Sequence, residues 1–248
     1  MMNIIHMSDL HLTADKKSIW GVDTYNQFMK ALKKIQSIRN IDCIIVTGDI
    51  ANDGKLETYH YANQKFEELG VPTFWCYGNH DNISVMNNSR LSFVQICNDA
   101  VLKGHRIIFI NSIKVDEDNP LYNCSKGYIS EFEFDRVRTT LNSETNRPVI
   151  IAMHHPSIEP GGWLTNKILK NRIQFNQFTT SYNVTCVLYG HIHCFTQVKL
   201  NNTLFTSSSS VGFAFDKDLP KYEIAKGQEG FSIIQITHNS ITVDNILI

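Results

Sequence analysis

The chain has 248 residues, with 23 Lys plus Arg against 24 Asp plus Glu and a formal net charge of -1. A chain of this length can bury a large core as one α/β domain, so we expect a single domain over residues 1–248. The balanced charge gives no chain-wide attraction to polyanions, which argues against nucleic acid or an acidic membrane surface as a partner. A small anionic substrate could still be bound locally.

The N-terminal segment carries no basic leader, and His6 and Asp9 interrupt its apolar run. No other apolar stretch approaches the roughly 20 residues needed to cross a bilayer. The six cysteines are scattered without a C-x-x-C pair, which is typical of thiols in a reducing compartment. We therefore expect a soluble, cytoplasmic protein.

Short apolar runs rich in β-branched or aromatic residues alternate with helix-length amphipathic segments. The spacing of Tyr25, Phe28, Leu32 and Ile35 predicts one buried helical face, and Ser130 stands three residues before Glu133, as in a helix capping box. The predicted strands of this first part cover residues 3–7, 43–47, 73–77, 106–110, 149–153 and 184–189.

After Tyr189 the pattern changes to hairpins, with strands predicted at 195–200, 203–207, 231–237 and 241–247. An α/β first part followed by antiparallel strands predicts two packed sheets with helices outside, rather than one doubly wound sheet. Long loops are expected at 81–98, 115–127, 156–165 and 212–227, and loops of that length are often functional. We expect 115–127 and 212–227 to control access to a site or to form a subunit contact.

Residues that can bind metal ions follow five of the predicted strands. Loops after strands are where α/β folds build their sites, so we expect these side chains to converge on one edge. The segments are Asp9-Leu10-His11, Gly48-Asp49, Gly78-Asn79-His80-Asp81, His154-His155-Pro156 and Gly190-His191-Ile192-His193.

The spacing within these segments has physical reasons. In an extended chain alternate side chains point the same way, so Asp9 with His11, and His191 with His193, could face one centre. Each glycine before a ligand would let the backbone turn sharply or approach the ions closely. Carboxylate, amide and imidazole ligands without a thiolate favour Mn, Fe or Zn.

The set D-x-H, G-D, G-N-H-D, H and G-H-x-H resembles the signature of the calcineurin-like metallophosphoesterase superfamily, complete and in order. Residues 47–51, 154–156, 161–164 and 189–193 are similar to the bacterial 3′,5′-cyclic-AMP phosphodiesterase branch. The resemblance covers essentially the whole chain. It implies a four-layer αββα sandwich of two mixed sheets flanked by helices, as one metallophosphoesterase domain.

The resemblance also implies roles for individual residues. One of two divalent ions would be held by Asp9, His11, Asp49 and His193, and the other by Asp49, Asn79, His154 and His191. His80 would protonate the leaving group, and Asp81 would orient its ring. We expect Asn79, His80, His193 and Trp163 to contact substrate and His155 to support the ligands, although His154 and His155 are separated by resemblance alone.

The implied reaction is hydrolysis of 3′,5′-cyclic AMP to 5′-AMP by a metal-activated hydroxide. Two divalent ions carry a combined charge of about +4, and two aspartates with a hydroxide carry about −3. The remaining positive charge would attract a phosphodiester anion. A broader hydrolase of 2′,3′-cyclic nucleotides, nucleotide pyrophosphates or lipid diesters is the first alternative. A non-catalytic scaffold and a DNA exonuclease rank lower, because His80 is present and no basic groove is evident. A homodimer is expected from similar proteins.

Overall fold

The computed structural model describes residues 1–114, 125–143, 147–182, 184–219, 222–237 and 240–248. One sheet has five strands in the order β11-β10-β1-β2-β3. Its first three strands in sequence run parallel, and β10 lies antiparallel to β1. The strands are β1 (Met2–Met7), β2 (Cys43–Val46), β3 (Thr73–Trp75), β10 (Gly230–Ile236) and β11 (Ile241–Leu247).

The second sheet has six strands in the order β4-β5-β6-β7-β9-β8. Its centre is parallel, and β4 and β8 pair antiparallel at the two edges. The strands are β4 (Asp99–Leu102), β5 (His105–Phe109), β6 (Val149–Ala152), β7 (Val184–Tyr189), β8 (Thr196–Leu200) and β9 (Thr203–Ser207).

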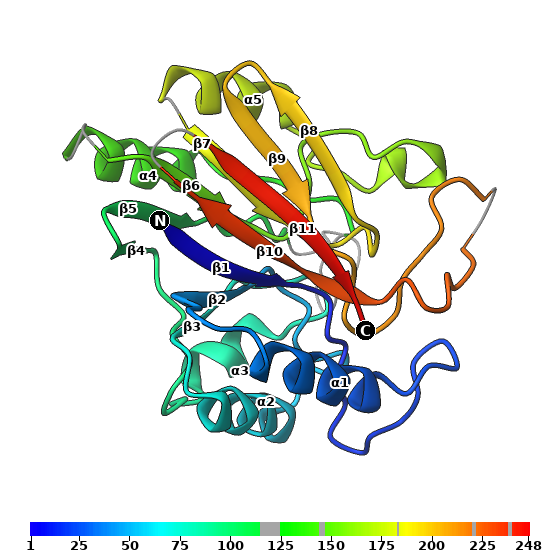
Figure 1. Cartoon of the computed structure of the whole chain (residues 1–248). Helices are drawn as coiled ribbons and strands as arrows, with labels where there is room; N and C mark the ends of the chain where they lie inside the picture. The colour runs from blue at the N-terminus through cyan, green and yellow to red at the C-terminus, as the bar shows by residue number, and fades with distance from the viewer. Residues whose placement is uncertain (115–124, 144–146, 183, 220–221, 238–239) are drawn as a thin grey trace.

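Helices cover the outer face of each sheet, as Figure 1 shows, so the predicted four-layer arrangement of two mixed sheets flanked by helices is confirmed. One set covers the five-stranded sheet and comprises α1 (Thr24–Gln36), α2 (Leu56–Leu69) and α3 (Ile83–Asn88). The six-stranded sheet is covered by α4 (Glu131–Ser143) and α5 (Arg172–Ser181), with a 3-10 turn at Gly162–Asn166.

Alternation along the strands divides the apolar residues among three cores. Ile4 and Ile150 point between the two sheets, whereas their neighbours Ile5 and Ile151 face the helices. A strand buried on both faces needs apolar residues at every position, which is why these runs are continuous rather than alternating. The parallel strands at the centre of the two sheets thus hold their carboxyl ends at one edge of the double layer.

Most of the predicted elements are present, with differences at the edges. The helix start predicted at Ser130 is confirmed, because the Glu133 amide donates to Ser130 Oγ at 3.2 Å, while the Glu133 carboxylate accepts from the Asn111 amide at 2.9 Å. Strand β4 was not predicted, since a four-residue edge strand of mixed polarity carries little periodic signal. The segment 81–98, predicted as a loop, contains α3, which begins at an Asn82 side-chain cap.

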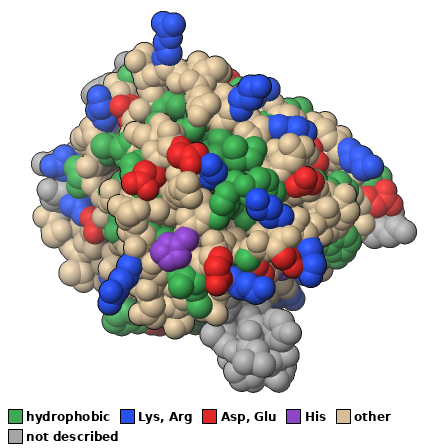
Figure 2. All heavy atoms as spheres, turned by 90° about the horizontal axis from the view of Figure 1, so that it is seen from below, with side chains coloured by type: hydrophobic (Ala, Val, Ile, Leu, Met, Phe, Trp, Pro, Cys, Tyr) green, Lys and Arg blue, Asp and Glu red, His purple; other side chains and the backbone are tan. Residues whose placement is uncertain are grey.

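Charged side chains of both signs are interspersed on the face that Figure 2 shows, in keeping with the balanced composition. Among the described helices, none is both long and apolar enough to span a membrane. The five cysteines within the described residues are free thiols, and Cys124 lies outside them.

Candidate metal centre

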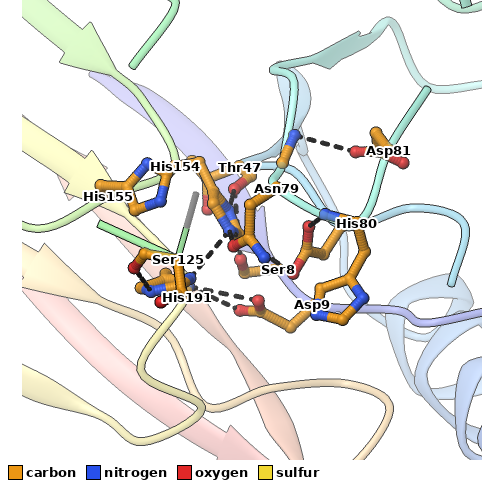
Figure 3. Close-up of polar contacts among 12 residues, drawn as sticks. Ser8, Asp9, Thr47, Asn79, His80, Asp81, Ser125, His154, His155 and His191 are labelled. Carbon is orange, nitrogen blue, oxygen red and sulfur yellow. Dashed lines mark hydrogen bonds and ion pairs between the residues drawn. The ribbon is translucent and has the colours of Figure 1, made fainter. Parts of the chain in front are cut away.

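The loops that follow β1, β2, β3, β6 and β7 meet at one edge of the two sheets. Figure 3 shows residues from these loops facing one another across a small space. The structure therefore brings together all the predicted ligand positions: Asp9, His11, Asp49, Asn79, His154, His191 and His193. Most of them are fully buried, although Asn79 and His191 are partly exposed.

The backbone of these loops differs from the extended form that the sequence spacing suggested. Asp9 and His11 lie beyond β1 and have φ values of 56° and 47°, in the left-handed region. The same holds for Asp49, His191 and His193, at 53°, 72° and 53°. Left-handed residues other than glycine are uncommon and cluster at functional sites. The paired ligands converge because the chain turns into the left-handed conformation after each strand. The prediction that they face one centre by alternation along an extended segment is therefore wrong.

Gly48 illustrates how closely the loops approach one another. A Cβ there would lie 2.7 Å from Gly78 Cα and 2.7 Å from His154 Nδ1, and the φ of 92° is also unfavourable for other residues. The adjoining loops are joined by hydrogen bonds from the Asp9 amide to the Gly48 carbonyl, at 3.1 Å, and from the His11 amide to the Asp49 carbonyl, at 3.0 Å. Only glycine fits at this junction.

The first ligand group consists of Asp9, His11, Asp49 and His193, whose ligand atoms all lie within 4.8 Å of one another. His193 Nε2 is 3.3 Å from Asp9 Oδ1, and His11 Nε2 is 3.5 Å from Asp49 Oδ2. The two Nε2 atoms of His11 and His193 approach to 3.1 Å. Two carboxylates and two imidazoles in a buried cluster can bind a divalent transition metal.

The second ligand group consists of His154, His155 and His191, which also meet within 4.8 Å. His154 Nε2 lies 3.2 Å from His191 Nδ1 and 2.9 Å from Asn79 Oδ1. It is also 3.4 Å from Asp49 Oδ2. Since that same oxygen lies 3.5 Å from His11 Nε2, the Asp49 carboxylate stands between the two groups.

The tautomers of four histidines are fixed by hydrogen bonds on the side away from the centre. In each ring one nitrogen faces a carbonyl or amide oxygen, which can only accept, so that nitrogen must carry the proton. These donors are His11 Nδ1 to Asn52 Oδ1 (3.0 Å), His154 Nδ1 to the Thr47 carbonyl (2.8 Å), His191 Nε2 to the Ser125 carbonyl (2.9 Å) and His193 Nδ1 to the Phe213 carbonyl (2.7 Å).

In the neutral rings, the remaining nitrogens therefore direct their lone pairs inward. Two such lone pairs meet at 3.1 Å in the first group and two at 3.2 Å in the second. Facing lone pairs repel one another unless a proton or a metal ion lies between them. Outer hydrogen bonds that fix the tautomer are typical of metal-binding histidines, so this donor set fits two divalent ions.

Without metal, the electrostatics of the site favour a neutral His11 and a protonated His154, whose proton can lie between His154 Nε2 and His191 Nδ1. Burial lowers the pKa of His11 to about 3, against the opposing charge of Asp49. Burial would raise the pKa of Asp49, but His154 and His80 hold it well below its usual value. At His154 burial is outweighed by Asp49, and the pKa rises to about 9. The site thus stabilises positive charge beside an ionised carboxylate.

His154 and His155, which the sequence could not separate, have different surroundings. The Ser112 hydroxyl accepts from the His155 amide at 3.2 Å and lies 3.0 Å from His155 Nδ1, to which it can donate. His155 Nε2 is buried and has no hydrogen-bond partner among the described residues. His154 is the neighbour that faces Asn79 and Asp49, which favours it as the ligand. The His155 ring packs 4.5 Å from that of His191.

His80 lies at the exposed mouth of the site. Its amide donates to Asp49 Oδ1 at 2.8 Å, and its ring stands edge-on to that of His11 with the centroids 4.8 Å apart. The side chain lines the same pocket as the ligands and belongs to neither ligand group. This position suits proton exchange with both a substrate and solvent.

Asp81 is buried behind the loops, and Figure 3 draws it away from the His80 ring. Its carboxylate accepts from the amides of Gly78 (2.9 Å) and Ala51 (3.0 Å) and from the Tyr59 hydroxyl (3.2 Å). Burial, with the charge of Asp49, raises its pKa to about 7. These contacts join the β2 and β3 loops, and the expected role of Asp81 in orienting the His80 ring stays a prediction.

A pocket of about 230 Å³ opens over the ligand groups. One of its sides is aromatic and is formed by Trp20, Phe213, Phe215 and Tyr222, with Lys167 nearby. Trp163, predicted to contact substrate, lies behind this wall: its ring packs 4.0 Å from Tyr222, and its indole N–H donates to the Asp216 carbonyl at 2.9 Å. For Phe213, Phe215 and Tyr222 the sequence offered only the length of the 212–227 loop as a signal, and it offered none for Trp20.

Comparison with known proteins agrees with this geometry. Residues 2–195 match the model of the family described as calcineurin-like phosphoesterase. The chain belongs to the calcineurin-like phosphoesterase family. This family uses divalent metals, and the two ligand groups provide residues that can bind them.

Several curated relatives of this family member are bacterial phosphodiesterases. A 3′,5′-cyclic-nucleotide phosphodiesterase of Nostoc is 26% identical over 95% of this chain and 88% of its own length. The cyclic AMP phosphodiesterase CpdA of Haemophilus influenzae is 24% identical over 95% of this chain and 86% of its own. CpdA of Escherichia coli K12 is 26% identical over 77% and 70%. Together with the family match, they support the prediction of a metal-dependent phosphodiesterase.

Solved structures support the fold. A dimetal phosphatase from Danio rerio superposes with a TM-score of 0.68 at 10% identity, covering 98% of this chain and 95% of its own. A Thermus thermophilus protein gives 0.64 at 13% identity and covers 98% of both chains. At such identities these likenesses show the shared architecture alone.

Proposed function

We propose that this chain hydrolyses 3′,5′-cyclic nucleotides, cyclic AMP first, to 5′-monophosphates with two divalent ions. The first ion would be held by Asp9, His11, Asp49 and His193, and the second by Asp49, Asn79, His154 and His191. The observation that carries the proposal is the pair of inward-facing imidazole contacts, 3.1 Å and 3.2 Å long, on either side of the Asp49 carboxylate.

The chemistry follows from these positions. When bound, divalent ions lower the pKa of a water and stabilise charge on phosphoryl oxygens. The water would lose a proton to solvent, its oxygen would attack phosphorus in line with the 3′ ester oxygen, and the P–O3′ bond would break. His80 gives its ring proton to the leaving oxygen and regains one from solvent, to which it is exposed.

The outer hydrogen bonds hold the ligand histidines in fixed orientations. Each ligand histidine donates a hydrogen bond that holds its ring in place, and the acceptors are the backbone carbonyls of Thr47, Ser125 and Phe213 and the side-chain oxygen of Asn52. Such partners orient a ligand and raise its basicity. Mn or Fe is the expected metal, with Zn as the alternative, since the ligands are oxygen and imidazole nitrogen. The cytoplasmic location and the homodimer stay predictions.

The test is hydrolysis by protein stripped of metal and reloaded with manganese. Cyclic AMP is compared with 2′,3′-cyclic AMP, a nucleotide pyrophosphate and glycerophosphoethanolamine. We expect metal-dependent turnover of 3′,5′-cyclic AMP that is lost in His80→Ala and retained in His60→Ala, a matched control at an exposed position on α2.

Turnover of another diester in preference to cyclic AMP would contradict the assignment of the substrate and leave the hydrolytic mechanism supported. If the protein contains two metal equivalents and hydrolyses none of these compounds, the proposal of an enzyme is wrong and a non-catalytic scaffold is favoured.

A further inference from the structure

Trp20 occupies the tip of a tight turn beside the metal centre. Ile19 and Val22 form an isolated antiparallel bridge, with reciprocal amide-to-carbonyl hydrogen bonds of 3.0 and 2.9 Å. The two residues between them, Trp20 and Gly21, have φ values of 53° and 75°. Two positive φ values define a type I′ turn, which strongly prefers Asn or Gly at its first central position. A tryptophan there is conformationally costly.

The same tryptophan is also exposed, with 59% of its surface accessible. A large apolar side chain in a strained turn gains little from burial here, so core packing does not account for it. Strain of this kind is found where function requires a side chain in one position. The turn places the indole on the wall of the pocket that also contains Asp49, His80 and His193.

A series of ring contacts connects the ligands to this indole. The His193 ring stacks on Phe215 with a centroid separation of 5.0 Å. Phe215 meets Trp20 edge-on at 5.9 Å, and Tyr222 lies nearly parallel to Trp20, also at 5.9 Å and with an interplanar angle of 21°. Tyr222 itself is 44% exposed. Phe215, which also contacts Tyr222 with the centroids 5.4 Å apart, is therefore the one ring between His193 and each of these two partly open aromatic rings.

We propose that Trp20 and Tyr222 form the surface on which the planar base of a nucleotide substrate stacks while its phosphoryl group lies at the ligand groups. The inference rests on the proposed function and assigns the residues that would select substrates with a nucleotide base. Bases stack on aromatic side chains with little dependence on sequence, because every base has a π face. An aliphatic diester, such as a glycerolipid headgroup, has no flat ring for this surface.

The test uses Trp20→Asn, because asparagine tolerates positive φ and keeps the turn. Binding of 5′-AMP and of ribose 5-phosphate to manganese-loaded protein is measured by calorimetry. We expect wild type to bind 5′-AMP more tightly than ribose 5-phosphate. In Trp20→Asn we expect the Kd of 5′-AMP to rise by about tenfold or more, with little change for ribose 5-phosphate. The melting temperature should stay the same or rise.

Trp20→Phe should restore most of the discrimination, since it returns an aromatic ring. Phe132→Ala is the matched control, because it removes an aromatic side chain that is 79% exposed on α4, away from this pocket. Equal losses for both ligands in Trp20→Asn, or no loss for either, would overturn the stacking role.

The two proposals fail in different ways. Loss of base discrimination in Trp20→Asn supports the stacking surface even if cyclic AMP is not hydrolysed, since binding is measured without turnover. Hydrolysis of cyclic AMP with an unchanged KM in Trp20→Asn would support the proposed function and overturn the stacking surface.

Discussion

The two ligand groups of this site differ in charge. The first group combines Asp9 and Asp49 with two histidines, all of them buried. The second consists of His154, His155 and His191, with Asn79 beside them and the Asp49 carboxylate 3.4 Å from His154 Nε2. The group itself contains no carboxylate. Carboxylates attract a divalent cation more strongly than neutral imidazoles do. The comparison predicts tight binding in the first group and weaker, exchangeable binding in the second, with Asp49 common to both.

The largest expected effect comes from Asp49→Asn, which removes the charge that the two groups share. We expect kcat/KM for the best substrate to fall by at least about a thousandfold. Metal content, measured by mass spectrometry after gel filtration, should fall for both equivalents. Asp9→Asn is the comparison and should lose mainly one. Retention of two equivalents by Asp49→Asn would contradict its shared position.

His80 belongs to neither group, so its substitution separates chemistry from ion binding. In His80→Ala we expect kcat to fall by about 10²- to 10³-fold while both metal equivalents are retained, because the ring supplies a proton rather than a ligand. The loss should be smaller for a diester with a nitrophenolate leaving group, which needs no proton. Equal losses with both leaving groups would argue against proton donation.

The second group also permits a direct test of neighbouring histidines. His154→Gln should lose one metal equivalent, since His154 Nε2 faces Asn79 and Asp49. His155→Gln should keep that ion with an affinity reduced by about 10- to 100-fold, as is typical of residues that support ligands. The metal Kd of each variant is measured by titration against a chelator. The opposite order would make His155 the ligand.

The smallest effect concerns His6, which is buried behind the ligand loops with Nε2 2.9 Å from Thr47 Oγ1. Burial lowers its pKa to about 3, with Asp9 opposing. Between about pH 3 and 6.5 the unfolded chain therefore binds a proton that the native His6 does not, so stability rises with pH in this window and levels off above it.

The measurement is urea unfolding of chelator-treated wild type and His6→Gln at pH 5.0, 6.0 and 7.5. The wild type should lose about 1.4 kcal/mol more stability per pH unit than the variant below pH 6.5, which corresponds to one proton. The same slope in both proteins would show that His6 is not buried in its neutral form.

The sequence alone determined much of the architecture. Continuous apolar runs such as those of β6 and β7 predict buried strands, and the two-layer arrangement follows from the change to hairpins after Tyr189. Ligand types after successive strands likewise predicted one metal-binding edge, because parallel strands bring their ends together. These features depend on local composition and on general packing rules.

Only the tertiary structure decided the details on which specificity depends. The left-handed backbone at Asp9 and His11, the separation of His154 from His155 and the contacts of Asp81 all depend on partners distant in sequence. The position of Trp20 beside Tyr222 is of the same kind. No periodicity encodes such contacts, since hydrogen bonds and ring stacking between distant segments form only when the whole chain packs.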